Sequence, residues 1–429
     1  MDASEVDASE TDSVVGDLHE VAMVSDLQVT EEYELGPDDV PPPEDQSELG
    51  DESVRGSDDE MDAVNEACEG ETSGEPQALE TLHGPIEDMS AQQLTAHTSA
   101  VFAVSVNAAN PYFFATGGGD DVGYLWRVGL AEPVARLQGH SETISSIGFS
   151  ADGNYLATGG LDGIVRVWSA DAGEPVVALE GPTQGINWVA WHSRGAVLLA
   201  GSEDATAWMW KVPEGSVMQI FSVHSGSVSY GGFANGGRNI ITASEDGTVR
   251  VWNPRAGTVD HCLHASSPQE PYAITCLAAH PSQAVYLFGI ETGAVKMAHA
   301  ETGKVLAALS SHDASVESVG FCDCMPLAAT GSMDGKLCIW ELNTFSLRHT
   351  CTHGAGVVEL LWRRQSPLLF SCTVSREIRL WDARSAECLK VLTGHRDAVL
   401  CMAIGYAQDA TYLISGSDDH TVRVWSIDV

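Results

Sequence analysis

Tryptophan recurs in this chain at an almost constant interval. Seven similar segments end at Trp126, Trp168, Trp210, Trp252, Trp340, Trp381 and Trp425. The first three intervals are 42 residues each and the last is 44. The interval from Trp252 to Trp340 is 88 residues, so one more repeat lies there, with Ala298 at the tryptophan position. A repeat of about 40–45 residues built from short strands is typical of propeller blades, so the sequence predicts an all-β fold of eight blades.

The second repeat shows the strand pattern of each unit. Apolar residues alternate over 144–149, 155–158 and 164–168, and Asp-Gly pairs separate these runs at 152–153 and 162–163. Asp-Gly between alternating runs favours tight hairpins. Each unit therefore supplies three strands, and the stretch after its tryptophan supplies a fourth. One such sheet cannot cover both of its faces, whereas radial packing of several sheets buries them.

Five units share four polar residues at fixed spacing, with Asp six residues before Trp and Ser or Thr four residues before Asp. The sets are His97, Thr116, Asp120 and Trp126; His140, Thr158, Asp162 and Trp168; His224, Thr242, Asp246 and Trp252; His312, Thr330, Asp334 and Trp340; and His395, Ser415, Asp419 and Trp425. This pattern resembles the WD-repeat family, and the resemblance implies that each set, here called a tetrad, holds one blade together. A buried carboxylate facing imidazole, hydroxyl and indole N–H groups is satisfied rather than stranded. The set also resembles a catalytic triad, but its repetition favours scaffolding, so we expect no catalytic residue and no enzyme.

Three units depart from the tetrad. The third has Pro182 and Ala200 at the His and Ser/Thr positions, and the seventh has Ser375 at the Asp position. The fifth has Thr292 and Ala298, with no identifiable histidine. We expect these blades to be softer. Their turns are either freer to serve a partner or products of sequence drift.

The ends of the chain predict how the ring closes. The last unit ends soon after Trp425, so its blade lacks a fourth strand of its own. Residues 89–95 resemble the segments 134–137 and 389–392, which precede the histidines of other units. We therefore expect an N-terminal strand to complete the last blade and remove an open edge.

Composition divides the chain into two parts. Residues 1–86 hold 27 acidic residues against one basic residue, Arg55, and Tyr33 is their only aromatic residue. Such a segment buries too little apolar surface to offset the entropy of ordering. We predict a disordered acidic tail over 1–86 and a propeller domain over 87–429. The tail either keeps the protein soluble or acts as a decoy or steering segment for a basic partner.

The propeller part is acidic as well, with 34 acidic and 20 basic residues. Such a field repels nucleic acid and anionic membranes and attracts basic proteins. We find no secretory signal and no apolar stretch of about 18 residues that could span a bilayer. The ten cysteines fall mostly within expected strands, which favours reduced, buried thiols. We expect a monomer in the cytoplasm, or also in the nucleus, that binds neither nucleic acid nor membranes directly.

A closer resemblance rests on particular segments. These are residues 197–201 and 208–213 in the third unit, 315–322 and 325–329 in the sixth, and 347–349 after it. Together with the acidic leader and the degenerate fifth unit, they resemble the angio-associated migratory cell protein family. The resemblance implies a non-enzymatic, protein-binding propeller that escorts a basic large-subunit ribosomal protein during ribosome assembly, as the fungal counterpart does. It also leaves open a cytoplasmic signalling scaffold in cell migration or angiogenesis.

A binding surface is expected where the tight turns and the histidine loops meet around the centre. The residue before the tetrad Asp position is acidic in four units: Glu203, Glu245, Glu291 and Asp418. Neighbouring loops and strand starts add Glu142, Asp313, Glu317, Glu359 and Asp397. Three aromatic residues, Phe102, Trp188 and Tyr230, occupy comparable positions in first strands. Carboxylates grip arginine, and aromatic rings anchor mixed basic and apolar peptides. Each acid is either part of this site or simply solvated.

Other clusters give weaker signals. Cys322 and Cys324 could begin a metal site, but no second pair stands at zinc-ligand spacing. His261, Cys262 and His264 also resemble ligands, but we expect them on an outer strand. We therefore predict no metal site and no cofactor.

Overall fold

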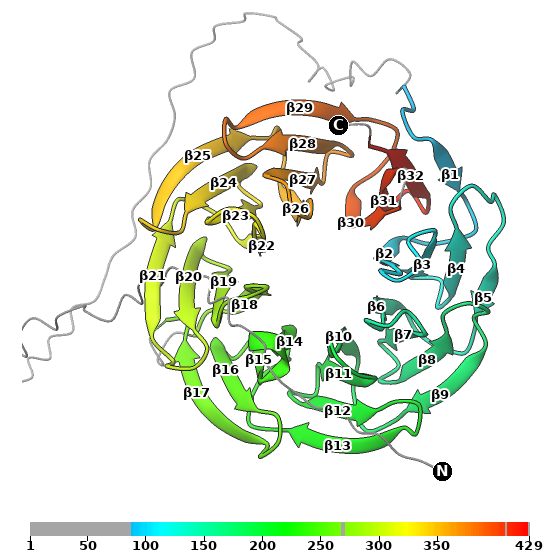
Figure 1. Ribbon diagram of the computed structural model, residues 1–429, viewed down its shortest axis with the longest axis horizontal. Coiled ribbons are helices and arrows are strands. Elements are labelled where there is room, and N and C mark those ends of the chain that lie inside the picture. The colour runs from blue at the N-terminus through cyan, green and yellow to red at the C-terminus, as the bar shows by residue number, and fades with distance from the viewer. Residues whose placement is uncertain (1–86, 267–270, 408–409, 428–429) are drawn as a thin grey trace, which may run out of the picture. The chain divides into compact units, whose positions relative to one another are not determined.

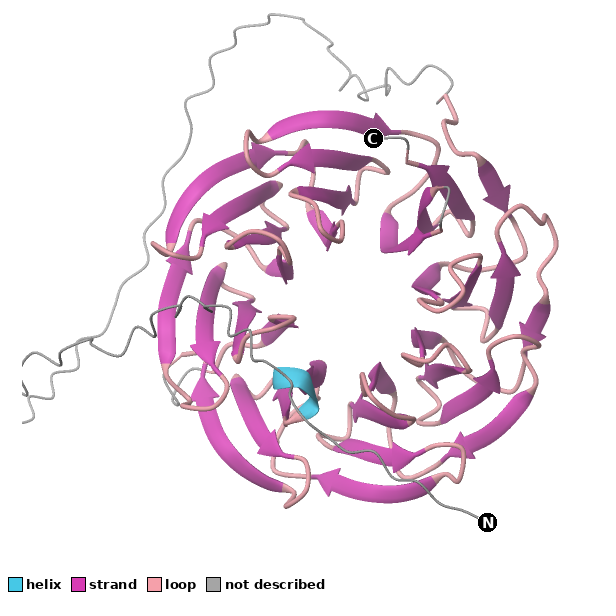
Figure 2. Ribbon diagram, viewed as in Figure 1, coloured by secondary structure: helices cyan, strands magenta, loops and turns pink. Residues whose placement is uncertain are grey.

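The computed structural model describes residues 87–266, 271–407 and 410–427. The acidic tail predicted for residues 1–86 lies outside these residues, and the boundary between residues 86 and 87 stays a prediction. The described residues belong to one compact unit. Its described part contains eight four-stranded antiparallel sheets arranged in a ring (Figures 1 and 2), which confirms the eight-bladed propeller.

Each blade is a meander whose first strand lies innermost and whose last strand lies outermost. Blades 1 to 4 consist of β2 (Val101–Val106), β3 (Phe113–Gly118), β4 (Gly123–Arg127) and β5 (Ala135–Leu137); β6 (Ile144–Phe149), β7 (Tyr155–Gly160), β8 (Val165–Ser169) and β9 (Pro175–Leu179); β10 (Ile186–Trp191), β11 (Val197–Ser202), β12 (Ala207–Lys211) and β13 (Ser216–Phe221); and β14 (Tyr230–Ala234), β15 (Asn239–Ala243), β16 (Thr248–Asn253) and β17 (Thr258–His264). A short 3-10 turn, η1 (Asn235–Gly237), joins β14 to β15.

Blades 5 to 8 repeat this arrangement. They consist of β18 (Ile274–Ala279), β19 (Val285–Ile290), β20 (Ala294–His299) and β21 (Val305–Ser310); β22 (Val316–Phe321), β23 (Leu327–Ser332), β24 (Lys336–Glu341) and β25 (Ser346–Thr352); β26 (Val357–Trp362), β27 (Leu368–Thr373), β28 (Ile378–Asp382) and β29 (Glu387–Leu392); and β30 (Val399–Tyr406), β31 (Thr411–Ser417), β32 (Val422–Ser426) and β1 (Gln92–Leu94). The hydrophobic core lies between adjacent blades, in a series of clusters that follow the ring.

The N-terminal strand completes blade 8, as the sequence predicts. β1 pairs antiparallel with β32, with Gln92 opposite Val424. Leu94 is 2% exposed and packs in the cluster shared by blades 8 and 1. Asp88 forms an ion pair with Arg423, which fixes the chain just before the strand. The two ends of the propeller therefore close one sheet, and the ring has no open blade.

The tetrads lie as the spacing predicts, with the hydroxyl group at the centre. In blade 1, the indole Nε1 of Trp126 donates to Thr116 Oγ1 over 2.8 Å. The same oxygen lies 2.8 Å from His97 Nε2, and His97 Nδ1 lies 3.0 Å from Asp120 Oδ1. Because Nδ1 faces a carboxylate, it carries the proton, and Nε2 accepts from the hydroxyl. The other four tetrads repeat these contacts, with hydroxyl-to-Nε2 distances of 2.7–2.8 Å.

Burial sets the protonation of these groups. It lowers the pKa of His140, His312 and His395, so the imidazoles stay neutral. Burial also raises the pKa of the Asp246 carboxyl, but hydrogen bonds from His224, Thr248 and a backbone amide outweigh it, and the resulting pKa is below the usual range. The imidazoles of His140, His312 and His395 are thus neutral donors to the Asp side chains beside them.

The departures in blades 3 and 7 leave donors or acceptors without partners. In blade 3, Ala200 offers no hydroxyl, and Trp210 Nε1 is buried without a hydrogen-bond partner among the described residues. In blade 7, Ser371 still accepts from Trp381 Nε1 over 2.8 Å and contacts His353 Nε2 at 3.1 Å. His353 Nδ1 has no hydrogen-bond partner in the described part of the chain, since Ser375 stands where the carboxylate would be. Burial, with the nearby Arg379, lowers the pKa of His353 to about 4.

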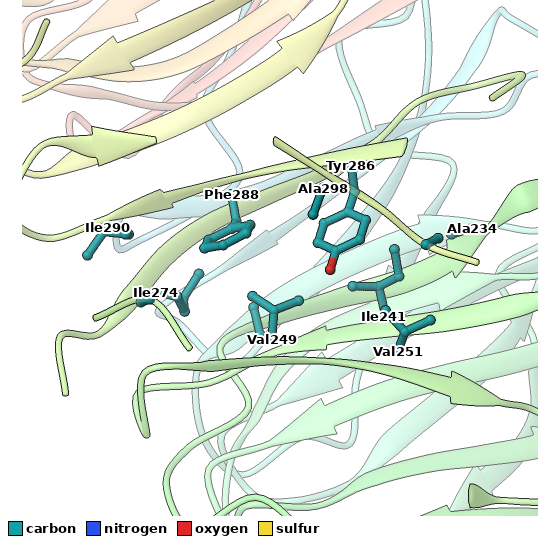
Figure 3. Packing of buried hydrophobic residues seen from close by; sticks show 12 residues of the cluster. Ala234, Ile241, Val249, Val251, Ile274, Tyr286, Phe288, Ile290 and Ala298 are labelled. Carbon is teal, nitrogen blue, oxygen red and sulfur yellow. The ribbon is translucent and has the colours of Figure 1, made fainter. Parts of the chain in front are cut away.

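Blade 5 replaces its tetrad with apolar packing. Tyr286 and Phe288 of β19 are fully buried, and their rings stack with centroids 6.1 Å apart. Figure 3 shows them in the cluster that includes Val249 of blade 4 and Ala298, which stands at the tryptophan position. The lost polar network is therefore filled by two large rings.

We predict opposite stability changes from two matched substitutions. Thr158→Ala leaves His140 and Trp168 without the central hydroxyl and should lower the free energy of unfolding by about 2 kcal/mol. Ala200→Ser offers the unpaired Trp210 Nε1 an acceptor and should raise the free energy of unfolding by about 1 kcal/mol. Denaturant unfolding followed by tryptophan fluorescence measures both. A loss of stability on Ala200→Ser would contradict this account of blade 3.

Candidate functional site

A cavity of about 570 Å³ lies at the centre of the ring, where inner strands of six blades meet. The strands that line it are β2, β6, β10, β14, β26 and β30. The cavity brings together six of the twelve residues expected at the binding surface: Phe102, Trp188, Glu203, Tyr230, Glu245 and Glu359. We call this space the central cavity.

Phe102 reaches the cavity because the inner strand carries a bulge there. The register of β2 and β3 shifts between Val101 and Ala103, so Phe102 has no partner in the ladder. A bulge bends the strand and redirects the side chain of the extra residue. Phe102 is 44% exposed and Tyr230, on β14, is 37% exposed. Both residues therefore present accessible surface at the cavity, while burial around the Tyr230 hydroxyl raises its pKa.

Glu203 and Glu245 bring negative charge to the same cavity. They lie in the tight turns β11–β12 and β15–β16, and both are exposed. Backbone bonds from Glu203 N to Gly185 O (2.9 Å) and from Glu245 N to Ser227 O (3.0 Å) fix these turns against the preceding loops. Within the described part of the chain, neither carboxylate pairs with a lysine or arginine. Two free carboxylates therefore stand beside two exposed rings.

Glu359 adds a third carboxyl group, from β26. Its Oε2 accepts from the Met402 amide of β30 over 2.6 Å, so it also joins blades 7 and 8. Ser146 and Ser318 make the equivalent bond to the next blade, over 3.1 Å. Burial raises the pKa of Glu359 to about 7. Its charge near neutral pH therefore depends on what occupies the central cavity.

The other predicted acids do not line the cavity. Glu291 is exposed and accepts from the Ala273 amide over 3.1 Å, and Asp397 and Asp418 are exposed. Glu317 is half-buried on β22. Burial is the main cause of the raised pKa of Tyr230, and electrostatic interactions with Cys276 and then Glu317 add to it. Of the acids named beside them, Glu142 is exposed, and Asp313 pairs with Lys336. Their role in binding stays a prediction.

Trp188 differs from the expected exposed anchor. It is 8% exposed, and its Nε1 donates to Val228 O of the next blade over 3.0 Å. Its ring occupies the space beside Gly201 and Gly231, which a side chain at either position would fill. Trp188 therefore packs blades 3 and 4 together and also lines the cavity.

Comparison with known proteins gives the family. The chain matches the family described as WD domain, G-beta repeat, over residues 89–127, 131–169, 173–211, 215–253, 303–341 and 386–426. These segments cover more than half of the chain. A WD repeat-containing protein of Schizosaccharomyces pombe is 36% identical over 364 residues, which cover 83% of this chain and 91% of that protein.

The chain belongs to the WD-repeat family. The human angio-associated migratory cell protein is 36% identical over 169 residues, which confirms the closer resemblance. That match spans 36% of this chain and 38% of the length of the human protein. The family description does not match the fifth and seventh repeats of this chain, which are the two without an Asp at the tetrad position.

Solved structures agree with the fold. Sqt1 of Saccharomyces cerevisiae has a TM-score of 0.74 at 22% identity, covering 80% of this chain and 100% of that chain. Sqt1 of Chaetomium thermophilum, bound to the N-terminus of the ribosomal protein L10, has a TM-score of 0.73 at 24% identity, with the same coverage. At this identity the likeness shows the shared fold.

Sequence reasoning missed two apolar residues on the rim of this WD-repeat propeller. Met333 and Val374 occupy the turn position of Glu203 and Glu245 in blades 6 and 7, and they are 44% and 41% exposed. The signal was present, since each stands directly before the tetrad Asp position. A pattern of charged residues does not include Met333 and Val374, because both side chains are apolar. The rim therefore offers apolar as well as acidic contacts.

The candidate metal ligands lie away from the central cavity. Within the described residues, Cys322, Asp323 and Cys324 form the grouping with metal-ligand spacing. Asp323 already accepts from the Gln365 amide at 2.9 Å, and burial raises the pKa of Cys322 to about 11, which disfavours a thiolate. His261 lies on the outer strand β17, and its Nε2 donates to the carbonyl of Glu301 over 2.8 Å.

The described helical structure contains no segment long and apolar enough to cross a membrane.

We predict that the stability of the propeller depends on pH through Glu359. The folded protein holds this proton more tightly than the unfolded chain does, so its contribution is present below about pH 4.5 and is lost as pH rises through about 7. Glu359→Gln keeps an acceptor for the Met402 amide. It should match the parent near pH 4.5 and exceed its free energy of unfolding by about 1–3 kcal/mol near pH 8. Denaturant titrations at several pH values test this, and a difference that does not change with pH would contradict it.

Proposed function

We propose that this WD-repeat propeller binds a basic peptide segment of a ribosomal protein at the central cavity and escorts that protein, without acting as an enzyme. The observation that carries the proposal is the pair of unpaired carboxylates, Glu203 and Glu245, beside the exposed rings of Phe102 and Tyr230. Carboxylates bind guanidinium groups by paired hydrogen bonds, and aromatic faces attract cations. An arginine-rich segment with apolar residues fits this chemistry.

The charge of the whole chain supports the same partner. The formal net charge is −40, with 61 acidic and 21 basic residues. Such a field speeds the approach of a basic protein and weakens as salt is added. The Sqt1 structure with the N-terminus of ribosomal protein L10 shows that a propeller of this fold holds a ribosomal-protein segment. We place the encounter in the cytoplasm, where ribosomal proteins are made.

A second candidate is a signalling scaffold in cell migration. The name of the angio-associated relatives favours it, as do the exposed side chains of Met333 and Val374 on the rim. Apolar contacts of this kind persist in high salt, whereas contacts made by carboxylates weaken. Salt therefore separates the two candidates.

Charge reversal at the cavity should weaken binding of a basic peptide. We expect Glu203→Lys and Glu245→Lys each to reduce the affinity of the full chain for a fluorescent arginine-rich peptide by about tenfold or more, and to flatten its salt dependence. Glu291→Lys makes the same charge change outside the cavity and should have a smaller effect. Fluorescence anisotropy at several salt concentrations measures this. Equal losses in all three variants, or unchanged binding at low salt, would contradict the proposed site.

The natural partner can be identified by affinity capture. The full chain is used as bait in cytosol at low and high salt, and the bound proteins are identified by mass spectrometry. One stoichiometric basic ribosomal protein, released by salt and lost with Glu245→Lys, is the expected result. A diverse set that resists salt would favour the scaffold instead.

A further inference from the structure

Three arginines gather at the end of blades 3 and 4 that faces away from the acidic rim. Arg194 lies in the β10–β11 turn, Arg238 directly after η1, and Arg255 in the β16–β17 turn. In an antiparallel meander, the turns after the first and third strands lie at one end, and the turn after the second strand lies at the other. The three arginines and Glu203 therefore occupy opposite ends of the same blades. All three arginines are exposed.

These arginines have no counter-charge. Within residues 87–266, 271–407 and 410–427, none of the three guanidinium groups lies within 4.0 Å of a carboxylate. The nearby acids have other partners: Asp152 accepts from Ser150 and Asn154, and Glu301 accepts from Asn235 over 2.8 Å. Elsewhere, Arg348, Arg379, Arg384 and Arg423 form ion pairs. Three free arginines together are unexpected where acidic residues are in such excess.

Two adjoining cavities lie beside them. One, of about 500 Å³, is lined by all three arginines together with His192, Gly236, Gly237, Asn253 and Pro254. The other, of about 390 Å³, shares His192, Gly237, Pro254 and Arg255 with the first and adds the apolar side chains of Val197, Met209, Met218 and Phe233. Positive charge therefore borders an apolar pocket. We call the two cavities together the arginine site.

The backbone between β14 and β15 keeps this site open. Gly237 has a φ of +84°, and a Cβ there would overlap the His192 ring. The ring packs edge-on against Phe233, with centroids 4.9 Å apart, and its Nδ1 accepts from the Arg194 amide over 3.1 Å. His192 is thereby fixed between the charged and the apolar cavity. The site is shaped by packing and hydrogen bonds, beyond the mere presence of surface arginines.

We infer that the arginine site binds an acidic peptide segment that carries a bulky apolar side chain. The guanidinium groups pair with its carboxylates, and the apolar side chain enters the pocket formed by Met209, Met218 and Phe233. Methionine side chains adapt to either an aliphatic or an aromatic residue. This partner is opposite in charge to the basic client of the central cavity, and the inference does not depend on that client.

Two observations favour a short peptide over a nucleic acid or a membrane. The propeller part as a whole is acidic, with 34 acidic and 20 basic residues, so it repels an extended polyanion. The pocket of about 390 Å³ has room for one or two apolar side chains, which a phosphate backbone does not offer. A peptide of a few carboxylates around one apolar residue satisfies both cavities.

The probe for this inference is a fluorescent peptide of aspartate and glutamate around a central Leu-Phe pair, titrated with the full chain. Arg238→Glu and Arg255→Glu should each weaken its binding by about tenfold or more. Met218→Asp should also weaken binding of this peptide. The loss of affinity should be much smaller for a peptide in which alanines replace the Leu-Phe pair. Arg396→Glu is the matched control, because it makes the same charge change at an exposed arginine in the histidine loop of blade 8.

The outcomes separate the alternatives. Binding that falls with Arg238→Glu but not with Arg396→Glu supports the arginine site, provided that the arginine-rich peptide still binds both variants. Equal losses in the two variants, or no binding of the acidic peptide by the parent, overturn the inference. A single-stranded RNA or anionic vesicles that bind through Arg238 more tightly than the peptide overturn the proposed occupant.

Discussion

The pairing of β1 with β32 is the contact on which the ring depends. Each sequence repeat ends with the third strand of one blade, so its first strand belongs to the blade before. This offset links every blade covalently to the next and leaves the last blade short of a strand, which β1 supplies. Without that pairing, β32 would expose an edge, and the cluster around Leu94 would lie open to water. Everything built at the centre of the ring requires this closure.

Closure also decides which central residues are free to bind. The inner strands of neighbouring blades contact each other without pairing as a sheet, so their edge groups need side-chain partners. Asn187, Thr275 and Cys401 donate to carbonyls of the following blade, over 3.2, 2.5 and 3.5 Å. Residues at this level are therefore largely committed to joining blades. Within the described residues, the side chains of Phe102 and Tyr230 make no such bond, and for this reason they remain available at the cavity.

The sequence predicts the repeated part of this molecule well because the same pattern of strands and tetrad residues recurs in most of the eight units. Blade number and tetrads follow from spacing, closure follows from the resemblance of residues 89–95 to the segments before other histidines, and all three appear in the structure. Packing at single positions does not follow from spacing. The sequence pattern places Trp188 in a position comparable to that of Phe102, but this is wrong: Phe102 is the unpaired bulge residue, whereas Trp188 pairs with Gly201. Glycines at positions 201 and 231 let the Trp188 ring enter the core. Likewise, the convergence of Glu245 but not Glu291 on the cavity depends on the local path of each turn, which a charge pattern cannot give.

The two ends of the blades obey different constraints, which explains their opposite chemistry. At the rim, the tight turns of six blades present the tetrad Asp carboxylate, and the residue before the tetrad Asp position is acidic in four blades. The turns at the other end serve no tetrad, and η1 with its two left-handed glycines shows how freely they vary. Acids summed around a ring act over a distance and steer a partner. Three arginines within an acidic field are screened beyond about 8–10 Å, so the arginine site can act only at contact, through the fit of its pocket.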